Sequence, residues 1–257
     1  MSLSPEGWHG WDEYAPFYDW ENARTLGRRD VAFWQRVARR ERARTLELGC
    51  GTGRLLMPVA RTGVPAVGLD RSVPMLARAQ QRTRRLPRAQ RPGLVRGDIR
   101  SLPFPDRSFG LVMAPYGLLQ SLVRDRDLTQ TLADVARVLR RGGLLGIDLV
   151  PDLPAWSEYA RKVSLQGKHA GGRVTLIESV RQDRRRKLTI FDEEFVHQRG
   201  RTTTRHTFSL TFRTLTVPAI VDRLERAGFR VDSFLGDYRG GPWTLDSTVW
   251  LLEARKR

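Results

Sequence analysis

The chain has 257 residues, 40% of them hydrophobic and 28% charged, which is the composition of an ordinary globular protein. Its length allows one large α/β domain with an elaboration, or two modest domains. No run of about 20 apolar residues occurs, so no membrane span is expected. The amino terminus lacks the basic and apolar segments of a signal peptide, and a single cysteine, Cys50, excludes an internal disulfide. We therefore expect a cytoplasmic protein.

The formal charge of +17 raises the question of a nucleic-acid partner, because basic surfaces gain affinity by releasing phosphate counterions. Only four of the 45 basic residues are lysines, and a GC-rich genome also produces this bias toward arginine. The basic residues extend along the whole chain, with the densest runs at 82–91 and 184–187. We interpret them first as a solvated surface and keep a nucleic-acid substrate as the second hypothesis.

Residues 1–43 predict an amino-terminal helical cap. Asp30 is expected to cap a helix whose Val31, Trp34 and Val37 share one face. The segment is rich in aromatic residues, which are Trp8, Trp11, Tyr14, Phe17, Tyr18 and Trp20. Such side chains more often pack than bind a ligand, and Tyr18 is the one that we also consider as a cofactor or substrate contact.

Residues 44–150 alternate between short apolar runs and amphipathic runs. Strands are predicted at 44–50, 66–70, 93–99, 109–116 and 143–149. Ser72 is expected to cap one intervening helix, with Pro74 in its first turn, and Asp127 to cap another that ends before Gly142. The alternation predicts an α/β fold with a doubly wound, mostly parallel sheet.

The pattern changes over residues 151–215. Three β-rich runs, 173–183, 187–198 and 204–214, are separated by charged or glycine-containing turns. Apolar residues alternate with polar ones in the last run, which indicates a sheet with one wet face. We therefore predict an antiparallel β insert after the fifth strand, which either covers the substrate or forms a dimer contact.

Residues 216–257 are predicted to complete the core. Helical periodicity begins at Thr216 and stops at Gly228. Two further strands, at 230–238 and 248–256, bring the predicted core sheet to seven strands.

The stretch LELGCGTGR, residues 46–54, is the most informative in the sequence. A glycine-rich turn after a first strand lets a ligand lie against backbone N–H groups. Dinucleotide-binding turns follow G-x-G-x-x-G, but here Arg54 occupies the place of the third glycine. Glu47 adds a negative charge that suits an ammonium group better than a pyrophosphate.

This stretch resembles the first motif of the class I S-adenosylmethionine-dependent methyltransferases, an acid followed by G-x-G-x-G. Asp70 ends the second strand, where the family's acid holds the ribose hydroxyls. Asp98 and Ile99 match the acid and the apolar residue that contact adenine. Segments 109–122 and 137–149 resemble the family's fourth strand and its helix–Gly-Gly–strand unit. The resemblance covers about residues 40–150 and implies a Rossmann-like fold with S-adenosyl-L-methionine as cofactor.

Carried over position by position, the resemblance implies a cofactor site formed by the first helical segment, the glycine loop and the ends of the following strands. Its residues are Tyr18, Glu47, Gly49, Cys50, Gly51, Thr52, Gly53, Asp70, Arg71, Met75, Asp98, Ile99, Ala114 and Pro115. Cys50 is interpreted as a small tolerated side chain rather than a reactive thiol.

No residue stands out as a catalytic base. Tyr116 and His206 are weak candidates, and His9, His169, His197 and His206 lack metal-ligand spacing, so no metal is expected. The acidic run 192–194 is interpreted as cross-strand partners for arginines rather than as a catalytic carboxylate pair.

The first hypothesis for function is a methyltransferase acting on a small molecule, because inserts in this position resemble those of small-molecule N-methyltransferases. The nitrogen or oxygen nature of the acceptor stays open, and a monomer or homodimer is expected. A nucleic-acid methyltransferase is the second hypothesis, although residues 114–117 lack the Asn/Asp-Pro-Pro-aromatic tetrad common in enzymes that methylate base amines. A non-catalytic regulator that binds the cofactor is the third.

Overall fold

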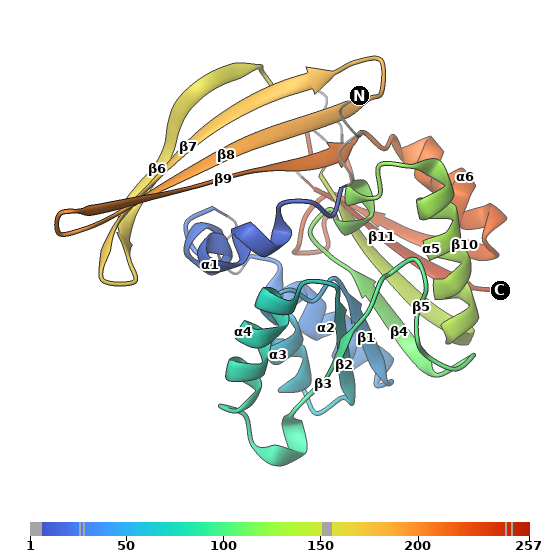
Figure 1. The fold of residues 1–257 in the computed structure, drawn as a ribbon. Helices are drawn as coiled ribbons and strands as arrows, with labels where there is room; N and C mark the ends of the chain where they lie inside the picture. Colours follow the sequence, from blue (N-terminus) through green and yellow to red (C-terminus); the bar gives the residue numbers. More distant parts are fainter. Residues whose placement is uncertain (1–6, 26, 28, 151–155, 245, 248) are drawn as a thin grey trace.

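The computed structural model describes the chain apart from six short stretches, which are residues 1–6, 26, 28, 151–155, 245 and 248. The first six residues of the predicted cap and the first five of the predicted insert therefore lie outside the described residues. The described residues form a seven-stranded sheet and a separate four-stranded sheet, with helix α1 (Trp11–Asn22) between the two (Figure 1).

The larger sheet confirms the predicted Rossmann-like fold. Its strands, in spatial order, are β10 (Phe229–Leu235), β11 (Trp250–Lys256), β5 (Leu139–Leu149), β4 (Phe109–Ala114), β1 (Thr45–Leu48), β2 (Ala66–Asp70) and β3 (Gly93–Arg96). All neighbours are parallel except β11, which is antiparallel to β10 and β5. Strand β1 has β2 as its neighbour on one side and β4 on the other, so the strand order reverses direction at β1. This switch point opens a crevice at the carboxyl ends of β1 and β4.

Helices cover both faces of this sheet (Figure 1). Helices α2 (Val31–Glu41), α3 (Leu56–Ala60) and α4 (Val73–Thr83) pack on one face, and α5 (Asp125–Val138) and α6 (Val217–Arg226) on the other. Trp34 of α2 is fully buried, and a Cβ on Gly146 of β5 would lie 2.8 Å from its ring. The bare backbone of Gly146 thus lets α2 approach the sheet.

Local signals predicted some helix ends and missed others. Ser72 caps α4 as predicted, because its Oγ accepts a hydrogen bond from the Met75 N–H. Asp127 is not a cap, since α5 begins at Asp125 and Asp127 binds Arg100 instead. Asp30 precedes α2 but its side chain does not cap it, because both carboxylate oxygens are held by Arg54.

The position of Gly142 also differs from the prediction. Helix α5 ends at Val138, and β5 follows directly from Leu139. Gly142 therefore lies within β5, at a φ of +71°.

The insert after β5 is antiparallel, as predicted, but has four strands where the sequence indicated three. They are β6 (Tyr159–His169), β7 (Gly172–Asp183), β8 (Leu188–Arg199) and β9 (Thr202–Arg213), paired in that order. The sequence pattern missed β6. This strand lies at the sheet edge, is largely exposed, and shifts register twice against β7, so it lacks a regular apolar alternation.

Helix α1 packs against the inner face of the insert rather than against the core sheet alone. The ring of Phe17 stacks on that of Phe195 at a centroid distance of 4.2 Å, and Trp20 Nε1 donates to the Lys168 carbonyl at 3.0 Å. Most of the aromatic residues near the amino terminus are therefore packing residues, as the sequence indicated.

The acidic run 192–194 divides between the two faces of β8. Asp192 pairs with Arg181, and Glu194 with Arg161 and Arg205, as predicted. The prediction was wrong for Glu193, which points inward and is buried, and its Oε2 has no hydrogen-bond partner.

Glu193 faces two further carboxyl groups. It lies directly opposite Glu178 on β7, and Tyr159 donates a hydrogen bond to Glu178. Glu21 of α1 accepts a hydrogen bond from Tyr14 Oη at 2.8 Å. Burial, followed by the charge of Glu21 and Glu178, raises the pKa of Glu193 well above its ordinary value.

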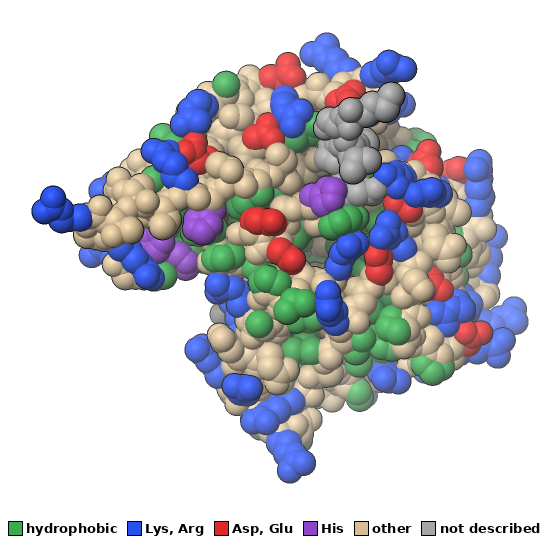
Figure 2. Space-filling model, in the orientation of Figure 1, with side chains coloured by type: hydrophobic (Ala, Val, Ile, Leu, Met, Phe, Trp, Pro, Cys, Tyr) green, Lys and Arg blue, Asp and Glu red, His purple; other side chains and the backbone are tan. Residues whose placement is uncertain are grey.

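In the part of the chain that the structure describes, no helix is both long enough and apolar enough to cross a bilayer. Lys and Arg side chains are scattered over the face shown in Figure 2 instead of forming one patch.

Candidate active site

The three glycines of the predicted loop adopt backbone conformations that side-chain-bearing residues rarely adopt. Gly49, Gly51 and Gly53 have φ angles of +57°, +52° and +76°. A Cβ at Gly49 would lie 2.6 Å from Leu118, and one at Gly53 would lie 2.7 Å from Met57. A Cβ at Gly51 would meet nothing closer than 3.9 Å, because this residue faces open space. The loop thus presents bare backbone to a ligand.

Asp70, at the end of β2, is held by the loop in one orientation. Its Oδ2 accepts the Gly51 N–H at 2.7 Å, and its Oδ1 accepts the Ser72 N–H at 2.8 Å. Burial raises the pKa of Asp70, and these N–H groups oppose the rise. Because each oxygen has a second acceptor site, the carboxylate can accept a pair of ligand hydroxyls.

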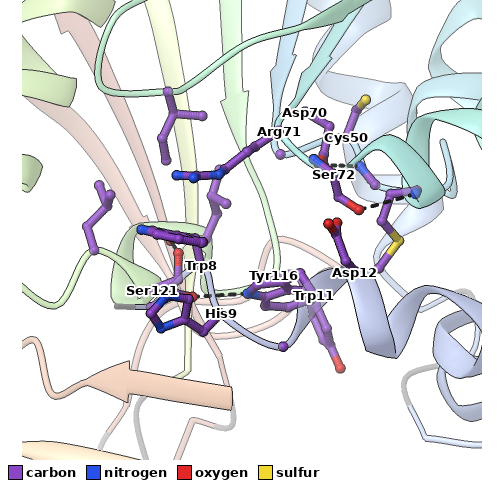
Figure 3. Close-up of a pocket in the computed structure, with 18 of the residues that line it drawn as sticks. Trp8, His9, Trp11, Asp12, Cys50, Asp70, Arg71, Ser72, Tyr116 and Ser121 are labelled. Atoms are coloured by element: carbon purple, nitrogen blue, oxygen red, sulfur yellow. Dashed lines mark hydrogen bonds between the residues drawn. The ribbon is translucent and has the colours of Figure 1, made fainter. Parts of the chain in front are cut away.

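These residues border a cavity of about 760 Å³ at the carboxyl ends of the core strands, between the core and the insert. Most of the predicted cofactor residues line it, namely Tyr18, Glu47, Gly49, Cys50, Gly51, Asp70, Arg71, Met75, Asp98, Ile99 and Pro115. The crevice predicted from the strand order is therefore the place where the sequence motifs meet. Figure 3 shows part of its wall.

Three predicted residues do not line this cavity. Thr52 is fully buried, and its hydroxyl donates to Asp19 and accepts from Arg82, so it braces the loop. Gly53 packs against Met57, and Ala114 is buried within β4. Cys50 borders the cavity but is 3% exposed, and burial raises the pKa of its thiol, which fits an inert side chain.

Asp98 also lines the cavity, but unlike Asp70 its carboxylate is paired with arginine side chains. Arg100 forks onto it, with Nε 3.0 Å from Oδ1 and Nη2 2.7 Å from Oδ2, and Arg71 lies 3.5 Å from Oδ2. These cations hold the pKa of Asp98 below its ordinary value. Its acceptor capacity is therefore shared with protein donors.

Several residues that line the cavity were not predicted as site residues from the sequence, because they lie in the amino-terminal segment outside the matched motifs. The Trp8 ring stacks on the Arg71 guanidinium at 3.5 Å, and Asp12 extends toward Ser72 (Figure 3). Glu13 also lines the cavity. In the sequence, the one indication of a site here was the aromatic and acidic composition of this segment. The first turn of a helix that packs against the core has the same composition.

Residues 7–10, here termed the strap, run between the core and the insert. A Cβ on Gly7 would lie 1.6 Å from the Ser121 carbonyl oxygen of the 3₁₀ turn η2 (Leu118–Ser121). A Cβ on Gly10, whose φ is +86°, would lie 2.6 Å from the Ser209 carbonyl oxygen of β9. The strap therefore covers the cavity only because both residues lack side chains.

Gly10→Ala is expected to lower thermal stability and weaken cofactor binding several-fold, because a left-handed alanine costs roughly 1–2 kcal/mol and its methyl group clashes with β9. Gly63→Ala is the matched control: its φ is +89° but its Cβ would meet nothing within 4 Å. Titration with S-adenosylhomocysteine and thermal melts of both variants measure the difference. Equal binding by the two variants would show that the strap does not cover the ligand.

Glu47 borders the cavity without a full set of hydrogen-bond partners. It is 3% exposed, and its Oε2 has no hydrogen-bond partner. Burial raises the pKa of Glu47 well above its ordinary value, and the charge of Arg54 opposes the rise only in part. A buried carboxyl oxygen without a donor is costly, and a ligand ammonium would satisfy it.

Of the two catalytic candidates, only Tyr116 lines the cavity. It follows β4 in a left-handed conformation, with φ at +57°, which is uncommon for a bulky residue and typical of functional sites. Burial raises the pKa of its hydroxyl, so Tyr116 is neutral near pH 7 and suited to positioning rather than to accepting a proton. His206 is exposed on β9 and does not border the cavity, with its ring 5.2 Å from that of Phe17.

Among the described residues, no group of three or more His, Cys, Asp or Glu side chains is arranged to hold a metal ion.

Comparison with known proteins supports the reading of these motifs. Residues 45–143 match the family model described as "Methyltransferase domain". A demethylmenaquinone methyltransferase from Lactiplantibacillus plantarum is 36% identical over 130 residues, which cover 47% of this chain and 53% of that protein. The chain thus spans about half the length of this relative.

Solved structures extend the similarity to the whole fold. An S-adenosylmethionine-dependent methyltransferase from Clostridium acetobutylicum superposes with a TM-score of 0.78 at 16% identity, covering 95% of this chain and 98% of that one. A sugar N-methyltransferase from Streptoalloteichus superposes with a TM-score of 0.75 at 17% identity, covering 93% of each chain. Both include the region of the insert, so the insert belongs to a recurring architecture.

Proposed function

The chain contains a class I S-adenosylmethionine-dependent methyltransferase domain, and from this premise we propose that it transfers the methyl group of S-adenosylmethionine to a nitrogen atom of a small amine. The observation that carries the proposal is the position of the cavity. It lies between core and insert and is crossed by the strap. Such a space suits a small molecule, whereas a nucleic acid requires an open groove lined by unpaired cations.

The described residues fit the cofactor. The Gly49–Gly53 loop leaves room at Gly51, Asp70 offers two oriented carboxylate oxygens for ribose hydroxyls, and Glu47 offers a buried oxygen for an ammonium group. When bound, the cofactor supplies a sulfonium-activated methyl group. The protein then has to position the acceptor and exclude water, which can provide much of the rate enhancement.

Charge and aromatic lining support an amine as the acceptor. Asp12 and Glu13 border the cavity and place two acidic side chains in its wall. Two of the arginines in the cavity wall, Arg71 and Arg100, are instead paired with Asp98. The wall on the side of the insert is aromatic, with Trp11, Phe208 and Phe212. Carboxylates and aromatic faces stabilise a cationic amine, and the Streptoalloteichus neighbour is a sugar N-methyltransferase.

The residues around the acceptor end suggest how the proton is handled. An amine must be neutral to attack, and its proton leaves with solvent before it is covered or passes to a cavity side chain. Tyr116 is neutral and able to accept or donate one hydrogen bond, so it would orient the nitrogen. Enclosure by the strap and β9 would keep water from competing.

The test is transfer of tritium from methyl-labelled S-adenosylmethionine to matched pairs of small molecules, such as amino sugars and the corresponding neutral sugars. We expect label in amines and not in their hydroxyl counterparts. The variant Asp12→Asn/Glu13→Gln should raise KM for the amine by about 10-fold, since two lost charge contacts of roughly 0.7 kcal/mol each sum to about 1.4 kcal/mol. Label in hydroxyl or carboxyl acceptors only would refute the amine, and label in RNA, lost steeply with salt, would favour the nucleic-acid hypothesis.

A further inference from the structure

Two consecutive residues after β4 adopt left-handed backbone conformations. Tyr116, which lines the cavity (Figure 3), has a φ of +57°, and Gly117 has a φ of +66°. Glycine adopts this conformation freely, but a bulky residue is strained in it. Such strain persists only where the surrounding contacts fix the backbone, so Tyr116 needs partners that hold it.

Asp148, near the end of β5, holds both of these residues with its two polar groups. Its backbone carbonyl accepts the Gly117 N–H at 3.0 Å, and its carboxylate accepts a hydrogen bond from the Tyr116 N–H. Strands β4 and β5 are parallel neighbours, with Ala114 opposite Ile147, so their carboxyl ends lie side by side. Asp148 therefore binds the left-handed pair at the point where the chain leaves β4 to form the cavity wall.

The Asp148 carboxylate is itself held by a second donor. Its Oδ2 accepts a hydrogen bond from the Tyr238 hydroxyl at 2.6 Å, and Tyr238 lies in the connection between β10 and β11. The Tyr238 carbonyl in turn accepts from Arg36 Nη2 at 2.6 Å, which ties this connection to α2. A chain of contacts thus runs from α2 through Tyr238 and Asp148 to Tyr116.

The burial of the Asp148 carboxylate distinguishes it from an ordinary core residue. Asp148 is 1% exposed, and burial raises its pKa to about 6, although the hydrogen bond from Tyr238 opposes the rise. The donors that bind this carboxylate are a phenol and a backbone N–H, and both are neutral. A buried acid held by neutral donors contributes little stability, whereas a satisfied polar network fixes the arrangement of the groups that it joins.

We propose that Asp148 is a positioning residue for methyl transfer, which holds Tyr116 in its left-handed conformation and so fixes the phenol at the cavity wall. Tyr238 supports this role, because it orients the carboxylate of Asp148. Neither Asp148 nor Tyr238 borders the cavity, so both act through Tyr116. This inference deepens the proposed function and rests on it, because it is there that Tyr116 orients the acceptor.

Asp148→Ala is expected to lower kcat by about 10- to 100-fold, because a small displacement of a group that orients the acceptor has an effect of this size. The affinity for S-adenosylhomocysteine should stay within about 3-fold of the parent, since Asp70 is held by other residues. Asp148→Asn keeps an acceptor oxygen for the Tyr116 N–H, and its kcat should be within about 3-fold of the parent. Steady-state kinetics and calorimetric titration measure the two quantities.

Asp148→Ala leaves the Tyr238 hydroxyl buried without a partner, which can unfold the protein. The double variant Asp148→Ala/Tyr238→Phe removes both groups and is expected to show the same loss of kcat. Tyr159→Phe is the matched control, because it also removes a tyrosine donor from a carboxylate, that of Glu178, but does so within the insert. Its kcat should equal that of the parent.

A double-mutant cycle shows whether Asp148 acts through Tyr116. Tyr116→Phe removes the phenol oxygen, and in this background Asp148→Ala should lower kcat by less than about 3-fold. Equal fold-losses in the two backgrounds would overturn the proposal, since they would reveal a structural role that does not involve Tyr116. An unchanged kcat in Asp148→Ala would overturn it as well.

These tests remain valid if the acceptor is not an amine. The kinetic comparisons need only an acceptor that takes the label, through nitrogen or through oxygen. A crystal structure of Asp148→Ala with S-adenosylhomocysteine needs no acceptor. In it Tyr116 should leave the left-handed region, and a φ still near +57° would contradict the role of Asp148.

Discussion

Asp70→Ala is expected to reduce the affinity for S-adenosylhomocysteine by at least about 100-fold, the largest effect of any single change in the cavity. The carboxylate is held by the Gly51 and Ser72 N–H groups, so both oxygens are already aimed before the ligand arrives. Two hydrogen bonds from ribose hydroxyls to a buried, oriented carboxylate are each worth roughly 1.5–3 kcal/mol. Calorimetric titration measures the loss, and a thermal melt shows whether the loop still folds.

Asp98→Ala is the informative comparison for this prediction. Arg100 and Arg71 already occupy its carboxylate, which is also partly exposed, so a ligand gains less from it. We expect a loss of about 10-fold or less, in line with a single hydrogen bond that replaces protein contacts. A larger loss of affinity for Asp98→Ala than for Asp70→Ala would contradict the assumed orientation of the ligand, in which the ribose contacts Asp70 and the adenine contacts Asp98.

Glu193→Gln is expected to make the protein more stable at alkaline pH, which is unusual for a change in a buried polar residue. Glu193, Glu178 and Glu21 lie together between α1 and the insert. Burial raises the pKa of Glu21 to about 7 and that of Glu193 well above its ordinary value. The carboxyl groups of Glu21 and Glu193 therefore stay protonated in the folded protein at pH values where they ionise in the unfolded chain.

The sign of the pH dependence follows from these raised pKa values. The contribution of Glu21 to stability is fully present below its unfolded pKa of 4.5. It is lost as the pH rises through the folded pKa of about 7. For Glu21 alone the loss is on the order of 3 kcal/mol, at about 1.36 kcal/mol per pKa unit. A glutamine at position 193 is uncharged at every pH, so the loss of stability between acidic and alkaline pH should be smaller in the variant.

Chemical denaturation at pH 5 and pH 8 tests this expectation. The parent and Glu193→Gln should be nearly equal at pH 5, and the variant should be more stable by at least about 1 kcal/mol at pH 8. Glu194→Gln, on the outer face of β8, is the matched control: it loses surface pairs with Arg161 and Arg205 and should change stability by less than about 1 kcal/mol. Identical pH profiles for the parent and Glu193→Gln would contradict the assignment.

The sequence by itself determined the features whose causes are local. Three positive φ angles require the glycines of the loop, the capping hydroxyl of Ser72 starts α4, and alternating strands and helices produce the doubly wound sheet. Each depends on a residue's own backbone preference or on neighbours within one turn. The same local order brought Asp70 and the glycine loop to one crevice, since parallel strands end at the same edge.

Only the tertiary structure decided which side chains meet across the chain. Asp30 looked like a helix cap and instead holds Arg54, and Glu193 looked like a partner for arginine and instead faces Glu178. Thr52 matched the cofactor motif and braces the loop, while Trp8 covers Arg71 from 63 positions earlier in the sequence. Charged and aromatic side chains interact with whichever groups lie close to them in the folded protein. The local periodicity of the sequence contains no information about contacts between residues that are distant in the chain.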